Sequence, residues 1–247
     1  MRALRALTRA ELLLFARNPT SVFMALLLPS LLLLLQGAVI PGSREPFAHD
    51  PAARPIDYLL PIALTVAVTS VAVTNYPSAI GAYRESGVLR RLGTTPVSAH
   101  NVLFSQWTVS GLSLVASVLI ATTLGVLAFD VSLPQNAALA VAALVTGTVA
   151  MMAVGSIIAA TAGSAQIAYG AGLLIFIASL FTAGVWTPGP MMPEYIAAVA
   201  ALTPAGAMTG AVTDAWHTGT VSPADFAVMG VWALAAGALA LKLFKWR

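Results

Sequence analysis

Residues 58–82 read YLLPIALTVAVTSVAVTNYPSAIGA, a run without a single charged side chain. A helix crosses the apolar core of a bilayer with about 20 residues, so this run is long enough to span a membrane once. Three more uncharged runs follow, at 101–129, 131–193 and 226–241. The run at 131–193 is so long that it must contain more than one crossing.

The composition agrees with a membrane protein. Hydrophobic residues make up 59% and charged residues 9% of the chain, and the mean hydropathy is +0.89. A soluble domain carries roughly a quarter charged residues. There is no cysteine, which excludes disulfides and thiolate metal sites. The three histidines have no acid or histidine at ligand spacing within a crossing, so we expect no metal site.

The uncharged runs predict an all-α integral membrane protein, a single domain over residues 1–247 with six transmembrane helices. We place the crossings at about 20–40, 58–82, 102–128, 138–161, 167–187 and 223–243. Helices are required because backbone polar groups in lipid must be satisfied within the segment. The first apolar run is too long for a cleaved signal peptide, and we interpret it as a retained span. The turn near residues 162–166 carries no charge and follows from the even number of crossings alone.

The basic residues indicate the orientation of the chain in the membrane. With both termini and the 83–101 loop in the cytosol, ten of the 12 basic residues lie inside: Arg2, Arg5, Arg9, Arg17, Arg84, Arg90, Arg91, Lys242, Lys245 and Arg247. Only Arg44 and Arg54 lie outside. Because cytosolic loops carry the excess of Lys and Arg, we expect a multi-pass protein of a bacterial plasma membrane with both termini in the cytosol.

Residues 1–19 precede the first crossing and are expected to form an interfacial elbow helix. Three cations share one of its faces, where they would meet anionic lipid headgroups: Arg2, Arg5 and Arg9. Glu11 falls on the apolar side of the same helix. The sequence Arg17-Asn18-Pro19 then predicts a break, because the residue before a proline is pushed out of the α region.

The loop 83–101, YRESGVLRRLGTTPVSAHN, is the internal loop with clustered basic residues. Three apolar residues share a face at helical spacing, and Gly93 is placed to end that helix: Val88, Leu89 and Leu92. Thr95-Pro96 is typical of the cap and first turn of the next crossing. The loop is therefore predicted to form a short amphipathic helix at the cytosolic surface. Its residues alone leave two partners open, phospholipid headgroups or another protein.

The outer segment 187–222 is mostly apolar, but prolines cut it into pieces too short to span a membrane. Two short re-entrant helices, at about 193–202 and 204–217, would fit between the fifth and sixth crossings. A buried lid and a gating element are both compatible with this segment.

The second and fifth crossings carry an unusual set of polar and aromatic residues. Packing between membrane helices is one explanation, since small and hydroxylated residues commonly join such helices. Asn75 stands out because an amide in the middle of a membrane needs a partner or water.

Three stretches together resemble the transmembrane permease subunits of ABC-2 type (class V-like) ABC exporters, which include bacterial drug-resistance permeases. In that family the loop after the second crossing runs approximately E-x-G-[TV]-L-[KR]-x-L-x-x-[TS]-P-[VL]. The chain matches it with Glu85, Gly87, Val88, Leu89, Arg90, Leu92, Thr95, Pro96 and Val97. The elbow and first helix are similar through Arg17-Asn18-Pro19 and Pro29. The exit of the fifth helix is similar through Pro188, Met192, Pro193 and Thr203-Pro204.

The resemblance implies a working assembly. The 83–101 loop would be the coupling helix that seats on a separate ATP-binding subunit, and two ATP-binding subunits would serve two permease copies, as a homodimer or a heterodimer. The residues also indicate that another subunit hydrolyses the ATP. A phosphate-binding loop needs a glycine-rich turn directly before a lysine, and the lysines of this chain, Lys242 and Lys245, follow no such turn. The chain is thus expected to be no enzyme and to hold no cofactor. ATP and Mg²⁺ would bind the partner, and no nucleic acid is expected to bind.

The resemblance also assigns roles to residues. Those expected to couple to the ATPase are Arg84, Glu85, Gly87, Val88, Leu89, Arg90, Arg91, Leu92, Thr95 and Pro96. The residues assigned to the elbow helix are Arg5, Arg9, Glu11, Arg17, Asn18 and Pro19. The substrate pathway would include Thr69, Thr74, Asn75, Ser78, Tyr169, Phe176 and Ser179, and the outer gate Pro188, Met192, Pro193 and Pro204.

The resemblance therefore implies a permease that moves a lipophilic or amphipathic compound, such as a drug, natural product or lipid, out of the cell. A polysaccharide or glycolipid export permease is an alternative, although aromatic residues, which stack on sugars, are only 8% of the chain. A non-transporting membrane subunit that binds an ATPase is another. A membrane-embedded enzyme would need clustered His, Asp or Glu near one membrane face, which the sequence lacks.

Overall fold

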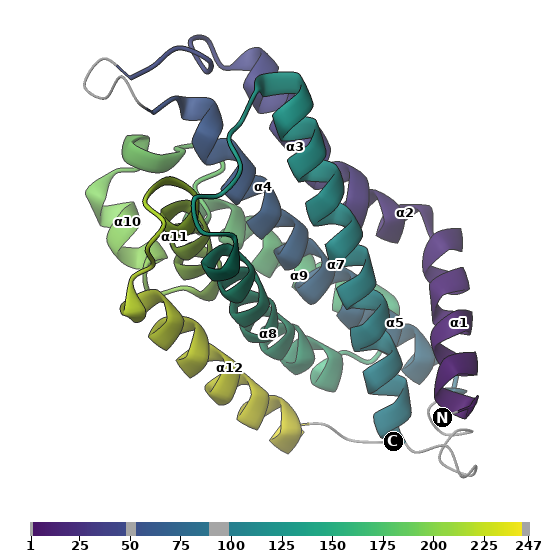
Figure 1. Cartoon of the computed structure of the whole chain (residues 1–247). Helices are drawn as coiled ribbons and strands as arrows, with labels where there is room; N and C mark the ends of the chain where they lie inside the picture. Colours follow the sequence, from purple (N-terminus) through teal and green to yellow (C-terminus); the bar gives the residue numbers. More distant parts are fainter. Residues whose placement is uncertain (1, 48–52, 89–98, 244–247) are drawn as a thin grey trace.

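The computed structural model describes residues 2–47, 53–88 and 99–243, and its regular elements are helices (Figure 1). The α-helices are α1 (Arg2–Arg17), α2 (Pro19–Val22), α3 (Leu28–Val39), α4 (Pro55–Ser70), α5 (Tyr76–Glu85), α7 (Ala99–Phe129), α8 (Ala137–Thr161), α9 (Ala165–Thr182), α10 (Glu194–Ala200), α11 (Pro204–His217) and α12 (Pro223–Leu243). Two π-helical turns, η1 (Phe23–Leu27) and η2 (Val71–Asn75), interrupt the first two long helices, and a 3₁₀ turn, η3 (Gly189–Met191), precedes α10.

Six helical segments of the described residues are long and apolar enough to cross a membrane, which confirms the predicted fold class. They are Pro19–Val39, Pro55–Glu85, Phe104–Phe129, Ala137–Thr161, Ala165–Thr182 and Pro223–Leu243. Each overlaps one predicted crossing. We call them spans one to six in chain order.

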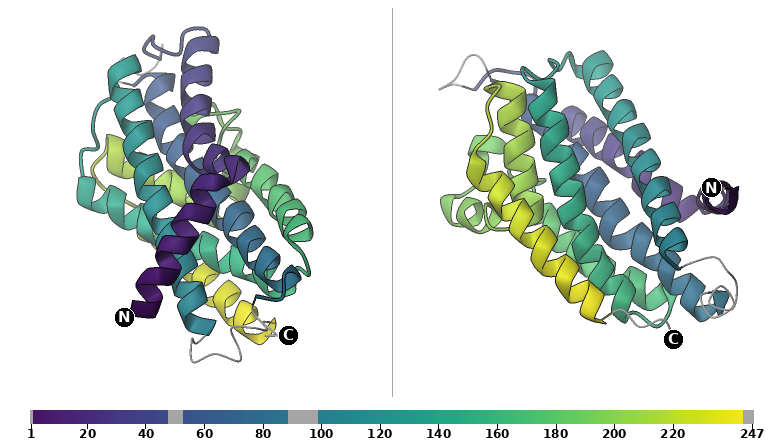
Figure 2. Two further views of the ribbon diagram at one scale, coloured as in Figure 1. Left: turned by 90° about the vertical axis from the view of Figure 1, so that its right-hand side faces the viewer. Right: turned by 60° about the horizontal axis from the view of Figure 1, so that its bottom comes forward.

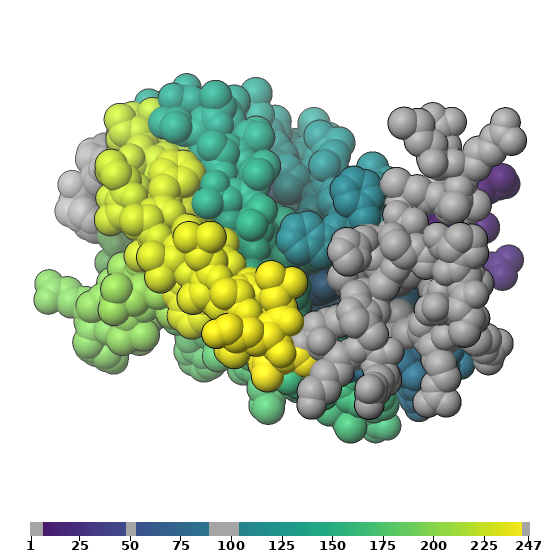
Figure 3. Space-filling view, turned by 90° about the horizontal axis from the view of Figure 1, so that it is seen from below, coloured from purple at the N-terminus to yellow at the C-terminus, as the bar shows by residue number. Residues whose placement is uncertain are grey.

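The ends of the spans sort into two groups. The N-terminal helix α1, the end of α5 and the turn between α8 and α9 lie at one end of the bundle, together with the C-terminal end of α12 (Figures 1 and 2). Seen from this end, α12 lies on the opposite side of the molecule from α1 (Figure 3). The bent pair α10 and α11 lies at the other end (Figure 1). This division matches the predicted even number of crossings.

Span two is the centre of the bundle. The most apolar stretch of Pro55–Glu85 is 94% buried within the chain, against 22% for span five and 17% for span six. Spans one, three, four and five all contact it, and α12 lies outside along α8 (Figure 2). Any large movement of span two must therefore displace several neighbours.

Prolines explain where the first two spans leave regular α geometry. Each π-helical turn ends two residues before a proline, Pro29 in span one and Pro77 in span two. The π turn shifts one backbone bond, since Leu28 N–H donates to Phe23 O and Tyr76 N–H donates to Val71 O. The following proline has no N–H to give, so one carbonyl per span is left without a helical donor.

Each of these carbonyls is in contact with a neighbouring helix. Ser70 Oγ donates to Met24 O, the carbonyl freed in span one, at 2.8 Å. The carbonyl of Ala72, freed in span two, lies against Gly155 of α8 so closely that a Cβ there would be 1.9 Å from the oxygen. A Cβ built on Gly172 of α9 would lie just as close to Val73 O, at 1.9 Å. The π-helical turn η2 is thus held between two glycine-lined helices.

The segment between spans five and six forms the predicted pair of short helices. α10 and α11 meet at an angle of 102°. Thr203 Oγ1 accepts from Gly206 N–H at 3.1 Å and Pro204 occupies the first turn of α11, as expected for a capped helix start. Met208 and Trp216 are buried, and Trp216 Nε1 donates to Ser132 O at 2.7 Å. α11 is therefore packed within the protein.

Two boundaries differ clearly from the sequence expectation. The fifth crossing was expected to reach residue 187, whereas α9 ends at Thr182. The second crossing was expected to stop at residue 82, whereas α5 continues to Glu85. Arg84 and Glu85 extend the helix because both side chains find partners at the turn between α8 and α9. Gly87 follows with φ of +69°, a left-handed conformation that glycine adopts without strain and that ends the helix.

Candidate functional site

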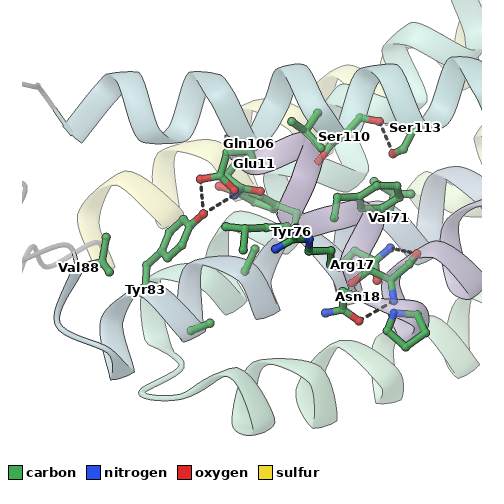
Figure 4. A pocket seen from close by; sticks show the side chains of 18 of the residues that line it. Glu11, Arg17, Asn18, Val71, Tyr76, Tyr83, Val88, Gln106, Ser110 and Ser113 are labelled. Atoms are coloured by element: carbon green, nitrogen blue, oxygen red, sulfur yellow. Dashed lines mark hydrogen bonds between the residues drawn. The ribbon is translucent and has the colours of Figure 1, made fainter. Parts of the chain in front are cut away.

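A cavity of about 600 Å³ lies beside α1. It is enclosed by the start of span one, the second half of span two and the first part of span three (Figure 4). Its apolar wall includes Leu14, Phe15, Val71 and Val109. Its polar wall comes from three elements: Glu11 of α1, Asn75 and Tyr83 of span two, and Gln106, Ser110 and Ser113 of α7. A mostly apolar wall with a few converging polar groups is the usual form of a site for a small molecule.

A buried polar triad closes one end of the cavity. Glu11 is only 4% exposed, and its carboxylate accepts hydrogen bonds from Tyr83 Oη and Gln106 Nε2 (Figure 4). Gln106 Nε2 also lies 3.4 Å from Tyr83 Oη. Burial raises the pKa of the Glu11 carboxyl, and the two hydrogen bonds oppose that rise in part. The triad joins α1 to spans two and three.

The elbow residues lie where the sequence places them. α1 ends at Arg17 and α2 begins at Pro19, which confirms the predicted break. Asn18 caps α2, its Oδ1 accepting from Ser21 N–H at 3.1 Å. Arg17, Asn18 and Pro19 line the cavity, and Arg17 and Asn18 lie at the end away from the triad (Figure 4). Arg9 is exposed, and Arg5 lies on α1.

The predicted pathway residues are mostly engaged within the bundle. Asn75 is the one that lines the cavity, and its Nδ2 donates to Ser21 O at 3.0 Å. Thr69, Thr74 and Ser78 each donate to the carbonyl four residues earlier in span two. In α9, Phe176 is buried, and Tyr169 and Ser179 are half-buried. These residues do not form one surface in the single chain, and their pathway role stays a prediction.

The predicted coupling residues divide into two groups. Leu89, Arg90, Arg91, Leu92, Thr95 and Pro96 lie outside the described residues. Of the rest, Val88 lines the cavity and Gly87 ends α5. Arg84 donates to Ala162 O and, at 3.5 Å, to Ala160 O, while Glu85 Oε2 accepts from Ala165 N–H at 3.4 Å. Arg84 and Glu85 therefore contact the turn between α8 and α9.

A smaller cavity of about 220 Å³ lies against the bent pair, and one of the four predicted outer gate residues lines it. Met192 lines it, together with Tyr58 of α4 and two carboxylates, Asp214 of α11 and Asp225 of α12. Pro188 is buried, Pro193 caps α10 and Pro204 starts α11. The prolines thus shape the outer segment, and gating by it stays a prediction.

Comparison with protein families decides the class of this chain. The family model described as ABC-2 type transporter matches residues 2–215, which include α1, the first five spans and most of the bent pair. The chain belongs to the ABC-2 type transporters. Comparisons with curated proteins and with solved structures gave no match.

Membership of the ABC-2 type transporters fixes the general role. The chain is a multi-pass membrane permease and not an ATPase. It pairs with an ABC ATPase subunit, which binds the ATP, and it carries no cofactor of its own. The expectation drawn from the three resembling stretches is confirmed at this level.

No sequence pattern singled out Tyr83 or Gln106 as a partner of Glu11. Both join Glu11 from positions 72 and 95 residues along the chain. A buried acid on the apolar face of α1 was the available signal, because a carboxylate in such a place needs hydrogen-bond donors. Nothing in the local pattern says which side chains supply them.

Proposed function

We propose that this ABC-2 permease exports a lipophilic or amphipathic compound from the cytosolic leaflet of a bacterial plasma membrane. The observation that carries the proposal is the cavity beside α1. Its volume of about 600 Å³ suits a drug-sized molecule. It lies at the end of the bundle that carries α1 and the end of α12, which the basic residues assign to the cytosol.

The lining of the cavity suits an amphipathic compound. Leu14, Phe15 and Val109 offer apolar surface, while Asn75 and Ser110 offer polar groups. An elbow helix in the headgroup layer would bring the mouth of the cavity to the level where amphipathic molecules collect. Two permease copies with two ATPase subunits would form the working transporter, with both termini of each permease in the cytosol.

The test is transport with the permease and its ATPase subunit reconstituted in vesicles. We expect ATP-dependent movement of at least one compound of a lipophilic fluorescent panel, and none with an ATPase that cannot hydrolyse ATP. Transport of glycolipids alone would favour the polysaccharide alternative. If the ATPase co-purifies but no compound moves, the proposal is wrong.

A matched pair of variants tests the cavity itself. Ser113→Phe would fill the cavity from α7, whereas Leu112 on the same helix is exposed and points away from the bundle. Ser113→Phe should reduce transport at least several-fold while ATP hydrolysis persists, and Leu112→Phe should change neither. Equal transport by the two variants would show that the cavity is not on the route.

A further inference from the structure

The turn between α8 and α9 carries no charged side chain, yet both of its helix ends are held by charges from elsewhere. Residues 162–166 read AGSAQ. Arg84 of α5 donates to Ala162 O and lies 3.5 Å from Ala160 O, at the end of α8. Glu85, the next residue, accepts from Ala165 N–H at the start of α9. Two adjacent side chains thus reach two different helix ends.

The signs of these charges match the helix ends that they contact. The last carbonyls of a helix carry partial negative charge and the first amides carry partial positive charge. A guanidinium at the end of α8 and a carboxylate at the start of α9 are therefore both favourable. Exchanging the two residues would place each charge against the wrong helix end.

The backbone of α5 is also in direct contact with the backbone of the α8–α9 turn. A Cβ built on Gly81 of α5 would lie 2.6 Å from Ser164 O and 2.9 Å from Ala165 N. No side chain separates α5 from the turn there, so the contact between them is close and stiff. One turn of helix later, Arg84 and Glu85 add the polar contacts.

We propose that Arg84 and Glu85 are positioning residues that fasten the α8–α9 turn to the end of α5, so that movement of the coupling segment is passed to spans four and five. This proposal rests on the proposed function, because it describes how a movement driven by ATP in the partner subunit would pass through the permease. Gly87 ends α5 two residues after Glu85, so the fastening lies at the start of the segment expected to contact the ATPase. Arg84 and Glu85 then act inside the permease, while Arg90 and Arg91 remain the expected ATPase contacts.

The first experiment needs the permease alone. The chain has no cysteine, so Ala82→Cys on α5 and Gly163→Cys in the turn give unique sites for spin labels. Dipolar broadening between the labels should be strong in the parent chain. Because charged hydrogen bonds contribute about 1.5–3 kcal/mol, Arg84→Ala should raise the population of the detached turn about tenfold or more and weaken the broadening. Unchanged broadening in Arg84→Ala and Glu85→Gln would overturn the proposal.

Two further variants separate fastening from general damage to the fold. Arg84→Lys keeps a cation near the carbonyls and should restore most of the broadening. Glu45→Gln removes an exposed carboxylate at the other end of the molecule and should leave the spectrum unchanged. If Arg84→Ala does not fold, Glu85→Gln carries the comparison, since it keeps the size of the side chain.

The second experiment uses the complex with its ATPase. Ile177→Cys lies on the exposed face of α9, and its labelling rate should differ between nucleotide-free and vanadate-trapped complexes. In Arg84→Ala and Glu85→Gln complexes purified together with the ATPase, this difference in labelling rate should fall at least several-fold. A difference that persists in both variants, or that is missing in the parent complex, would contradict the proposal. Failure of the ATPase to co-purify with the parent chain would instead contradict the proposed function, and the spin-label result would stand independently.

Discussion

Glu11 is an ionisable residue that is buried and therefore loses most of its hydration. Its carboxylate is almost completely buried between α1 and spans two and three, and it is satisfied by Tyr83 and Gln106. Removing one partner from a buried charged group costs more than the net contribution of an ordinary hydrogen bond, because the remaining group loses its solvation as well. The triad therefore fixes α1 against the bundle.

The raised pKa of Glu11 predicts a pH dependence of stability. A carboxyl whose pKa is higher in the folded than in the unfolded chain favours folding most when it is protonated. This contribution is complete below the ordinary pKa of glutamate and is lost as the pH rises through the higher pKa of the folded state. As the pH rises from below the ordinary pKa of glutamate through the higher pKa of the folded state, the melting temperature of the parent chain should fall relative to that of Glu11→Gln, measured by thermal unfolding in detergent.

Tyr83→Phe provides the control for this prediction. It removes a donor that opposes the rise in the Glu11 pKa, so the fall in melting temperature should extend to higher pH than in the parent chain. Identical pH profiles for the parent chain, Glu11→Gln and Tyr83→Phe would show that Glu11 does not titrate in this way.

Among the elements, the π-helical turn η2 determines how spans two, four and five pack. Gly155 of α8 and Gly172 of α9 allow the backbone carbonyls of Ala72 and Val73 to come into direct contact with those helices. A regular α-helix without Pro77 would keep these carbonyls within its own hydrogen-bond pattern. The π-helical turn and the two glycines are thus one structural unit made by three helices.

Replacing Gly172 with alanine should destabilise the permease strongly. The new Cβ would meet Val73 O at 1.9 Å, and a backbone atom cannot rotate away. We expect a loss of about 1–3 kcal/mol or more, as in other overpacked interiors. Gly170→Ala on the same helix has open space around the new Cβ and should be neutral or slightly stabilising. Thermal unfolding in detergent measures both, and equal melting temperatures would contradict the close packing.

Asn75→Ala distinguishes a structural from a transport role at η2. The variant loses the hydrogen bond to Ser21 O that joins spans one and two, at a cost of about 1 kcal/mol. If the hydrogen bond is the whole role, the melting temperature falls and the relative transport of different compounds is unchanged. A changed preference among compounds would instead support the predicted place of Asn75 on the pathway.

At the scale of the whole molecule, span two is enclosed by its own chain, while few residues of spans five and six are fully buried within it. In a membrane, such apolar surface faces lipid or another protein. The enclosed span two and the peripheral α12 show that the six helices are not equivalent. Because α5 is part of span two, a displacement of the end of α5 would act directly on the centre of the bundle.

Cysteine labelling tests the arrangement of the ends. Gly163→Cys, in the α8–α9 turn, should react with a membrane-impermeant maleimide only from the cytosolic side. Glu45→Cys, in the loop between α3 and α4, should react only from the opposite side. The cysteine-free parent chain is the control. Labelling of both positions from one side would contradict the six-span arrangement.

The sequence by itself determined the spans, the break at Arg17-Asn18-Pro19 and the two short helices around Pro204. These features depend on local hydropathy and on the stereochemistry of proline, which act within a few residues. The tertiary structure alone decided the partners. Pro29 and Pro77 each leave a carbonyl without a helical donor, and Glu11 needs donors. Ser70, Tyr83 and Gln106 supply hydrogen bonds from distant parts of the chain, and Gly155 leaves room for the Ala72 carbonyl against α8. A local pattern shows that a polar group lacks a partner, whereas the packing of the helices determines which group can reach it.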